Sequence, residues 1–162
     1  MAETKTYGLL QVLAGAVLTS GDFPDAGDMT ELCKTYKNSC EFTEADPTIT
    51  DEFSDQQDDP IHTFIEKGSK EIKFSTFDYT PATLVKLKGG TSLNDVWSEP
   101  ATIPEIFQAI ELKLASGNSF KFPKCRIFAK FNAKLVKNGL SLLEVTIKPV
   151  LPADGKPVVM FG

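Results

Sequence analysis

One stretch of this 162-residue chain has the pattern of a helix with a defined beginning and end, at residues 80–88. Thr80 is a good N-cap residue and is followed by a proline, which suits the first helical position. Leu84 and Leu87 share one face, and Gly89-Gly90 then stops the helix, because glycine takes the left-handed conformation cheaply. Nearly all of the remaining chain has the pattern of strands. A short helix cannot bury its apolar face alone, so we expect it to cover the flank or end of a β structure.

Alternating apolar and polar residues predict strands through most of the chain. The alternation is regular at residues 106–114, where a helix is the remaining alternative, and it is clearest at residues 125–135 and 143–148. Asn138-Gly139 predicts a tight hairpin between the last two strands. We therefore expect a single mainly β domain over residues 1–162. Its fold is predicted to be a sandwich or barrel of two packed antiparallel sheets, flanked by one short helix.

Three segments are expected to extend from this body. One is an acidic loop at residues 46–60, whose composition predicts mobility in the free protein. The others are an N-terminal arm at residues 1–6 and a C-terminal arm at residues 151–162, which prolines keep extended. Two further strands are expected on either side of Gly68.

Charge is unevenly distributed along the chain. From residue 113 onward, basic residues face only Glu144 and Asp154. This basic part of the chain and the acidic segment at residues 41–59 are poles of opposite charge, which favour self-association. Two separate solvated surfaces that never meet are an equally good interpretation. The net charge of -5 argues against a dedicated nucleic-acid binder. The acidic pole, residues 41–59, has eight carboxylates and no lysine or arginine: Glu41, Glu44, Asp46, Asp51, Glu52, Asp55, Asp58 and Asp59.

The residues that usually carry catalysis or hold metals form no recognisable constellation. His62 is the single histidine, and a surface or structural role is the simpler interpretation. The acidic loop lacks the ligand spacing of an EF-hand, and Gly89-Gly90 lacks a phosphate-loop context. Trp97 is expected to be partly buried. We therefore expect no enzyme, no catalytic residue, no cofactor and no metal site.

The cysteines and the apolar segments bear on location. Cys33, Cys40 and Cys125 are an odd number without CxxC spacing, which favours buried thiols in a reducing compartment. The apolar run at residues 9–18 follows a poor positive region, so a secretory signal is disfavoured. No stretch reaches the length of a membrane span.

The order of these features resembles that of tailed-bacteriophage tail tube proteins. The resemblance rests on the segment FTEADPTITDEFSD at residues 42–55 and on Asp59-Pro60-Ile61. It continues through the helix TPATL at residues 80–84, its Gly-Gly-Thr close, and the strand entry FPKCRI at residues 122–127. It covers roughly residues 7–152 as a pattern of elements, since this family is held together by fold more than by signature residues.

The resemblance implies a structural subunit. Six copies would form a ring with a β-barrel inner wall, and rings would stack into a hollow tube through which DNA passes. Implied partners are the chain itself, the tape measure protein, the tail terminator and the baseplate or tip proteins, with DNA only transiently in the lumen and no membrane. The implied locations are the virion tail and, during assembly, the cytoplasm of the bacterial host. If the lumen were lined by Lys130 and Lys134 it would drag on DNA, so these lysines are expected to face outward or to pair with acids.

By position, the resemblance assigns the inter-ring contact to the acidic loop. The residues concerned are Asp46, Asp51, Glu52, Asp55, Asp58 and Asp59. The terminal arms, from residues 2–6 and 151–162, are expected to add contacts within or between rings.

Two alternatives stay open at this level. The same tube fold serves contractile injection machines and type VI secretion, which the sequence does not separate from a phage tail. A different class is a β-sandwich module that binds carbohydrate or protein, with the acidic loop as a calcium-dependent site. A small hydrolase that uses acidic residues is the weakest alternative, because no constellation marks one.

Overall fold

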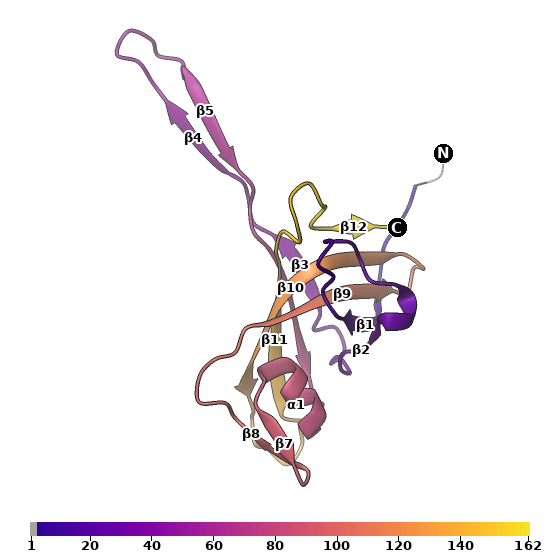
Figure 1. The fold of residues 1–162 in the computed structure, drawn as a ribbon. Coiled ribbons are helices and arrows are strands. Elements are labelled where there is room, and N and C mark those ends of the chain that lie inside the picture. The colour runs from indigo at the N-terminus through magenta and orange to yellow at the C-terminus, as the bar shows by residue number, and fades with distance from the viewer. Residues whose placement is uncertain (1–2) are drawn as a thin grey trace.

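The computed structural model describes residues 3–162 and shows a mainly β protein with one short α-helix (Figure 1). The predicted fold class is confirmed. Met1 and Ala2, which belong to the expected N-terminal arm, lie outside the described residues. The elements are β1 (Leu9–Gly15), the 3-10 helix η1 (Ala26–Asp28), β2 (Thr30–Glu31), β3 (Glu41–Glu44), β4 (Thr48–Glu52), β5 (His62–Glu66), β6 (Lys70–Thr76), α1 (Pro81–Lys88), β7 (Thr91–Leu93), β8 (Val96–Ser98), β9 (Ile106–Leu114), β10 (Ser119–Asn132), β11 (Leu142–Pro149) and β12 (Met160–Phe161).

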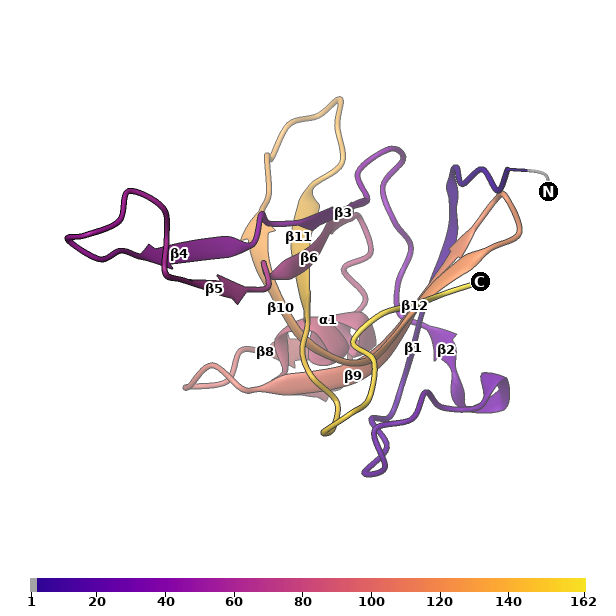
Figure 2. The same cartoon turned by 90° about the horizontal axis from the view of Figure 1, so that it is seen from above.

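Eight strands form one antiparallel sheet in the order β2-β1-β9-β10-β11-β6-β3, with β12 added beside β10. The sheet is strongly curved but not closed (Figure 2). Phe42 of β3 packs edge-on against Phe120 and Phe122 of β10, at ring-centroid distances of 5.3 and 5.2 Å, although β11 and β6 separate these strands in the hydrogen-bonded order. The two layers of the sandwich are thus two halves of one folded sheet.

The core lies on the concave side of this sheet. Its centre is built from alternate residues of neighbouring strands, which point to the same face because side chains on a strand alternate. Fully or nearly fully buried side chains include Val12, Ile72, Ile110, Phe122, Ile127, Leu143 and Val145.

Helix α1 closes one end of the core, as the sequence predicts. Leu84 and Leu87 are buried and join the core cluster. Gly89 ends the helix with φ 74°, and Trp97 donates its indole N–H to the Gly89 carbonyl at 2.8 Å. The half-buried Trp97 is therefore a structural residue that fixes the end of the helix.

The start of α1 depends on a residue that the sequence analysis did not single out. Thr80 occupies the N-cap position, but its side chain makes no capping hydrogen bond. The Asp78 carboxylate instead accepts hydrogen bonds from the Thr80 N–H at 3.0 Å and the Thr83 hydroxyl at 3.1 Å. Burial raises the pKa of Asp78, but hydrogen bonds from the Thr80 hydroxyl, the Thr80 N–H and the Thr83 hydroxyl, together with the charge of Lys86, outweigh it, so the net pKa is lowered.

The prediction of a tight hairpin turn at Asn138-Gly139 is wrong. Pairing of β10 with β11 stops at Asn132 and Leu142, so residues 133–141 form a longer connection. The reason is that this connection has no buried face, which leaves nothing to hold the two strands in register to their ends. The two-residue hairpin turn lies instead at Asn94-Asp95, between β7 and β8, where φ is 51° and 59° as a type I′ turn requires.

The C-terminal arm lies on the sheet in this structure. Phe161 of β12 packs against Phe120 with ring centroids 4.8 Å apart, and Gly162 and Ser119 exchange two backbone hydrogen bonds. Lys156 also pairs with Asp22 at 2.8 Å. This segment is thereby attached to β10 at its end and to the N-terminal half of the chain near its middle.

Candidate assembly surface

The segment predicted as an acidic loop, residues 46–60, forms strand β4 and the tip of a β-hairpin that projects from the body (Figures 1 and 2). The second strand of this hairpin, β5, lies in the strand expected before Gly68. We call residues 45–67 the arm. Its strands β4 and β5 pair antiparallel over five residue pairs, from Thr48 with Glu66 to Glu52 with His62. Every residue of both strands is exposed. The arm is therefore a two-stranded ribbon without a layer to pack against, a structure that is marginally stable alone.

The six predicted contact residues are spread along the whole arm. Asp46 lies near the body, Asp51 and Glu52 lie on β4, and the tip carries Asp55, Asp58 and Asp59. All six are exposed, and none forms an ion pair with any residue in the described range 3–162. Asp51 accepts a hydrogen bond from the Thr63 hydroxyl across the ribbon at 2.7 Å. The structure brings these carboxylates onto one projection but leaves them without partners of opposite charge.

The sequence analysis missed the apolar side chains of the arm. Ile49 and Ile65 are direct cross-strand partners, so they share one face of the ribbon. Phe64 lies on the opposite face, against the ring of His62 at 4.4 Å. The exposed large apolar residues of the arm are Ile49, Phe53, Ile61, Phe64 and Ile65. Clustered exposure of this kind marks interaction surfaces. The signal was present in the sequence as apolar residues interleaved with acids.

A close backbone contact joins the arm to the body. The Ala45 N–H donates to the Ser69 carbonyl at 2.9 Å, which continues the pairing of β3 with β6 toward β4 and β5. At Gly68 a Cβ atom would overlap the carbonyl oxygen of Ala45. Position 68 therefore requires glycine for space, and the two strands expected on either side of it belong to different pairings: β5 to the arm and β6 to the main sheet.

The basic half of the chain lies mostly on the convex side of the sheet. Lys130 pairs with Glu144 of β11 at 3.3 Å, in agreement with the expectation that it faces outward or pairs with an acid. A hydrogen bond from Asn132 and the interaction with Lys130 hold the pKa of Glu144 below its usual value. Lys134 is exposed in the connection after β10. Six of the eight carboxylates of the acidic pole thus lie on the arm, whereas Glu41 and Glu44 lie on β3 of the main sheet, where Glu44 pairs with Lys70.

The cysteines are free thiols within the body. Burial raises the pKa of Cys33 to about 12 and that of Cys40 to about 11, and it raises the pKa of Cys125 as well. Thiols of this kind are weak nucleophiles at neutral pH. Within residues 3–162, the histidine, cysteine and carboxylate side chains form no group of three or more that is placed to hold a metal ion.

The comparisons with known proteins add no identity. No family model matches the sequence, and no curated protein matches it. Among the described residues, no helix has the length and apolar character needed to cross a membrane.

Proposed function

We propose that this chain is the structural subunit of a hollow tube, in which copies assemble into stacked rings, in the manner of a bacteriophage tail tube or the related tube of a contractile injection machine. The observation that carries the proposal is the arm. It is an exposed ribbon that carries five exposed large apolar residues and seven carboxylates against a single lysine, Lys67. A surface of this composition is best explained by a partner that covers its apolar side chains and neutralises its charge.

A second copy of the chain suits this role. The arm and the basic clusters of the body are different surfaces of one molecule, so contact between them is heterologous. Heterologous contacts do not have to close, and repeated contacts then build rings, filaments or tubes. The exposed edges of an open, curved sheet provide further places where neighbouring copies can pair.

The proposal also accounts for the resemblance described above. An acidic segment at this position would be the contact between successive rings, and the mainly β body with one helix would form the ring. The function is then mechanical: the tube provides a passage for DNA and holds no substrate. Partners at the ends and in the lumen would be the tail terminator, the baseplate or tip proteins and the tape measure protein, in a virion tail assembled in the cytoplasm of the bacterial host.

The proposal is tested by static light scattering over a concentration series, with electron microscopy of the same samples. The wild-type protein is expected to form hollow tubes or six-membered rings. In a shortened variant, Asn-Gly replaces residues 49–65, so that a tight turn joins Thr48 directly to Glu66 and the body stays unchanged. This variant is expected to fold, as judged by circular dichroism, and to form no tubes.

Two results would count against the proposal. If the shortened variant forms tubes as well as the wild type does, the arm is not needed for assembly. A wild-type protein that stays monomeric at every concentration and is stabilised by calcium would favour the β-sandwich binding module instead.

A further inference from the structure

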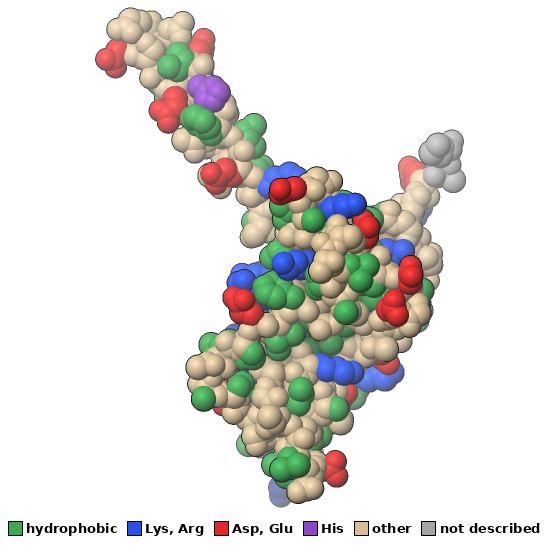
Figure 3. Space-filling view, in the orientation of Figure 1, with side chains coloured by type: hydrophobic (Ala, Val, Ile, Leu, Met, Phe, Trp, Pro, Cys, Tyr) green, Lys and Arg blue, Asp and Glu red, His purple; other side chains and the backbone are tan. Residues whose placement is uncertain are grey.

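Three cations on the convex side of the sheet contact aromatic rings. The Lys124 ammonium group lies 4.8 Å from the ring centre of Phe107, and the Arg126 guanidinium group lies 5.3 Å from the same ring. Lys148 lies 5.9 Å from the ring centre of Phe128. These five residues come from β9, β10 and β11, which are adjacent in the sheet, and we call them the acceptor face. In the space-filling view, basic side chains are scattered over the body among hydrophobic and acidic ones, and some lie at the base of the arm (Figure 3).

The charges of the acceptor face are only partly used. Arg126 reaches Glu105 at 3.5 Å, a long contact between two largely exposed side chains. Lys124 and Lys148 have no acidic side chain within 4 Å anywhere in the described chain. Both ammonium groups are therefore free to meet a carboxylate while their stems stay on the aromatic rings.

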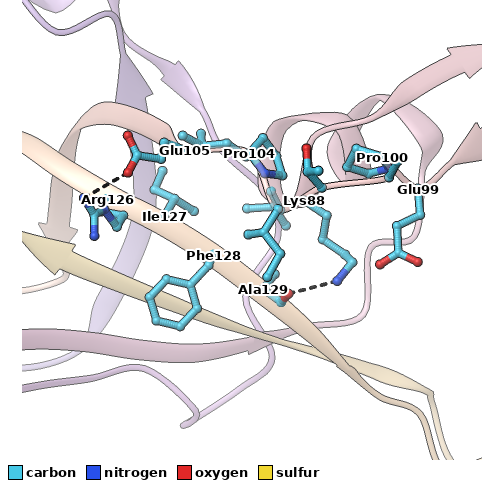
Figure 4. A pocket seen from close by; sticks show the side chains of 14 residues that line it. Lys88, Glu99, Pro100, Pro104, Glu105, Arg126, Ile127, Phe128 and Ala129 are labelled. Atoms are coloured by element: carbon cyan, nitrogen blue, oxygen red, sulfur yellow. Dashed lines mark hydrogen bonds and ion pairs between the residues drawn. The ribbon is translucent and has the colours of Figure 1, made fainter.

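A groove of about 750 Å³ opens beside the acceptor face (Figure 4). Arg126 and Phe128 of β10 form part of its lining, and Pro100 and Pro104 of the segment before β9 form another part. Ile103 in this segment is 93% exposed. The lining also includes Glu99 and Glu105, so the acceptor face combines unpaired positive charge with a groove that is only partly apolar and has room for several side chains.

We propose that the acceptor face binds the arm of a second copy of this chain. The inference rests on the proposed function and names the surface that receives the arm. The two surfaces have complementary chemistry: the arm offers carboxylates interleaved with isoleucine and phenylalanine, and the acceptor face offers cations interleaved with phenylalanine and a partly apolar groove. The arm points away from its own body in both ribbon views, so it does not cover the acceptor face of its own chain (Figures 1 and 2).

An acidic peptide ribbon fits this face better than a nucleic acid does. A nucleic acid would satisfy the cations, but it would leave the apolar part of the groove and Ile103 without cover. The net charge of -5 also opposes the approach of a polyanion, whereas it does not prevent a local contact between unlike poles.

The test uses two charge-reversal variants of the full chain. The face variant carries Lys124→Glu and Lys148→Glu. The arm variant carries Glu52→Lys, Asp55→Lys, Asp58→Lys and Asp59→Lys, which change seven carboxylates and one lysine into three carboxylates and five lysines and so make the arm basic. Each variant alone has two like-charged surfaces and is expected to need a roughly tenfold or higher concentration to assemble than the wild type. An equimolar mixture is expected to assemble again, because the acidic arm of the face variant meets a basic face and the basic arm of the arm variant meets an acidic one.

The matched control carries Lys134→Glu and Lys137→Glu. It makes the same change of charge as the face variant, on two exposed lysines outside the acceptor face, and it is expected to assemble like the wild type. A second measurement does not depend on the folding of variants. Wild-type subunits with light and heavy nitrogen isotopes are mixed and treated with a carbodiimide, which joins a carboxylate to a lysine in direct contact. Intermolecular cross-links from residues 46–59 to Lys124 or Lys148 are expected in the mass spectrum.

The outcomes separate this inference from the proposed function. Tubes that need the arm but form normally with the face variant, with cross-links to other lysines, would overturn the acceptor face alone. Absence of any self-association and of any intermolecular cross-link would overturn both. A third outcome is that a short DNA duplex binds to the wild-type monomer and not to the face variant, while no cross-links to the arm form. The acceptor face would then bind nucleic acid and not the arm.

Discussion

Replacement of the paired isoleucines of the arm by threonine, Ile49→Thr with Ile65→Thr, should weaken assembly without unfolding the body. Ile49 and Ile65 are 60% and 68% exposed in the free chain and share one face of the ribbon. Complete burial of such a side chain contributes about 2–3 kcal/mol, so covering the exposed part of each contributes about 1.5 kcal/mol. The pair then contributes about 3 kcal/mol to each arm contact, which corresponds to a dissociation constant about 100-fold higher in the variant.

Threonine keeps the preference for a strand, so the ribbon itself should persist. The assay is the concentration at which light scattering and sedimentation first detect assemblies. The matched control is Leu93→Thr with Val96→Thr, which removes the cross-strand pair of the β7–β8 hairpin, where exposure is 73% and 61%. If the isoleucine-to-threonine variant assembles at the same concentration as the wild type, or if the control loses assembly equally, burial of the arm does not drive assembly.

Three further changes test the body and its joint. Gly68→Ala should destabilise the protein by about 1–3 kcal/mol in urea unfolding and increase hydrogen exchange in the arm, because the new Cβ would overlap the Ala45 carbonyl. The control is Gly27→Ala, which has open space around it and should have neither effect. Asp78→Ala should cost about 1 kcal/mol through loss of the hydrogen bonds at the start of α1. The pKa of Asp78 is lower in the folded than in the unfolded protein, so the ionised carboxylate stabilises the fold above its unfolded pKa. This stabilisation is lost as the pH falls through the folded pKa. The free energies of unfolding of the wild type and Asp78→Asn should therefore converge in acid. Iodoacetamide at pH 7.5 should label neither of the buried thiols, Cys33 and Cys125, in the native protein within minutes, and it should label all three cysteines in urea. Rapid native labelling of Cys33 or Cys125 would contradict their burial.

The sequence predicted the parts of the fold that depend on local pattern. Strand β9 and helix α1 have the predicted bounds, because alternation and the Gly-Gly stop are local signals that the core also supports. Asn138-Gly139 misled the analysis, because a turn forms only where paired strands reach it. Asp78 was overlooked because capping from two residues before the N-cap has no simple pattern.

The exposure of the six acidic residues on one segment was predicted, but the structure of that segment was not. Strand β5 matches the strand expected before Gly68, but composition indicated a loop at residues 46–60, where the structure has β4 and the tip of the hairpin. The reason is that the carboxylates dominate the composition while the register of Ile49 with Ile65 depends on a partner strand sixteen residues away. The acceptor face was beyond local reasoning altogether, since Phe107, Arg126 and Lys148 meet only through sheet pairing.

The continuity of the arm with the main sheet has a mechanical consequence. Backbone hydrogen bonds of an antiparallel ladder lie perpendicular to the strands, so a pull along the arm loads the bonds of β6 with β3 and β11 in shear, many at a time. Peeling, in which bonds break one after another, would require a pull from the side. The two ladders meet at the contact of Gly68 with Ala45, where the hydrogen bond from the Ala45 N–H to the Ser69 carbonyl carries the pairing from the body toward the arm. In an assembly held together through its arms, tension along an arm would therefore be resisted by many backbone hydrogen bonds at once.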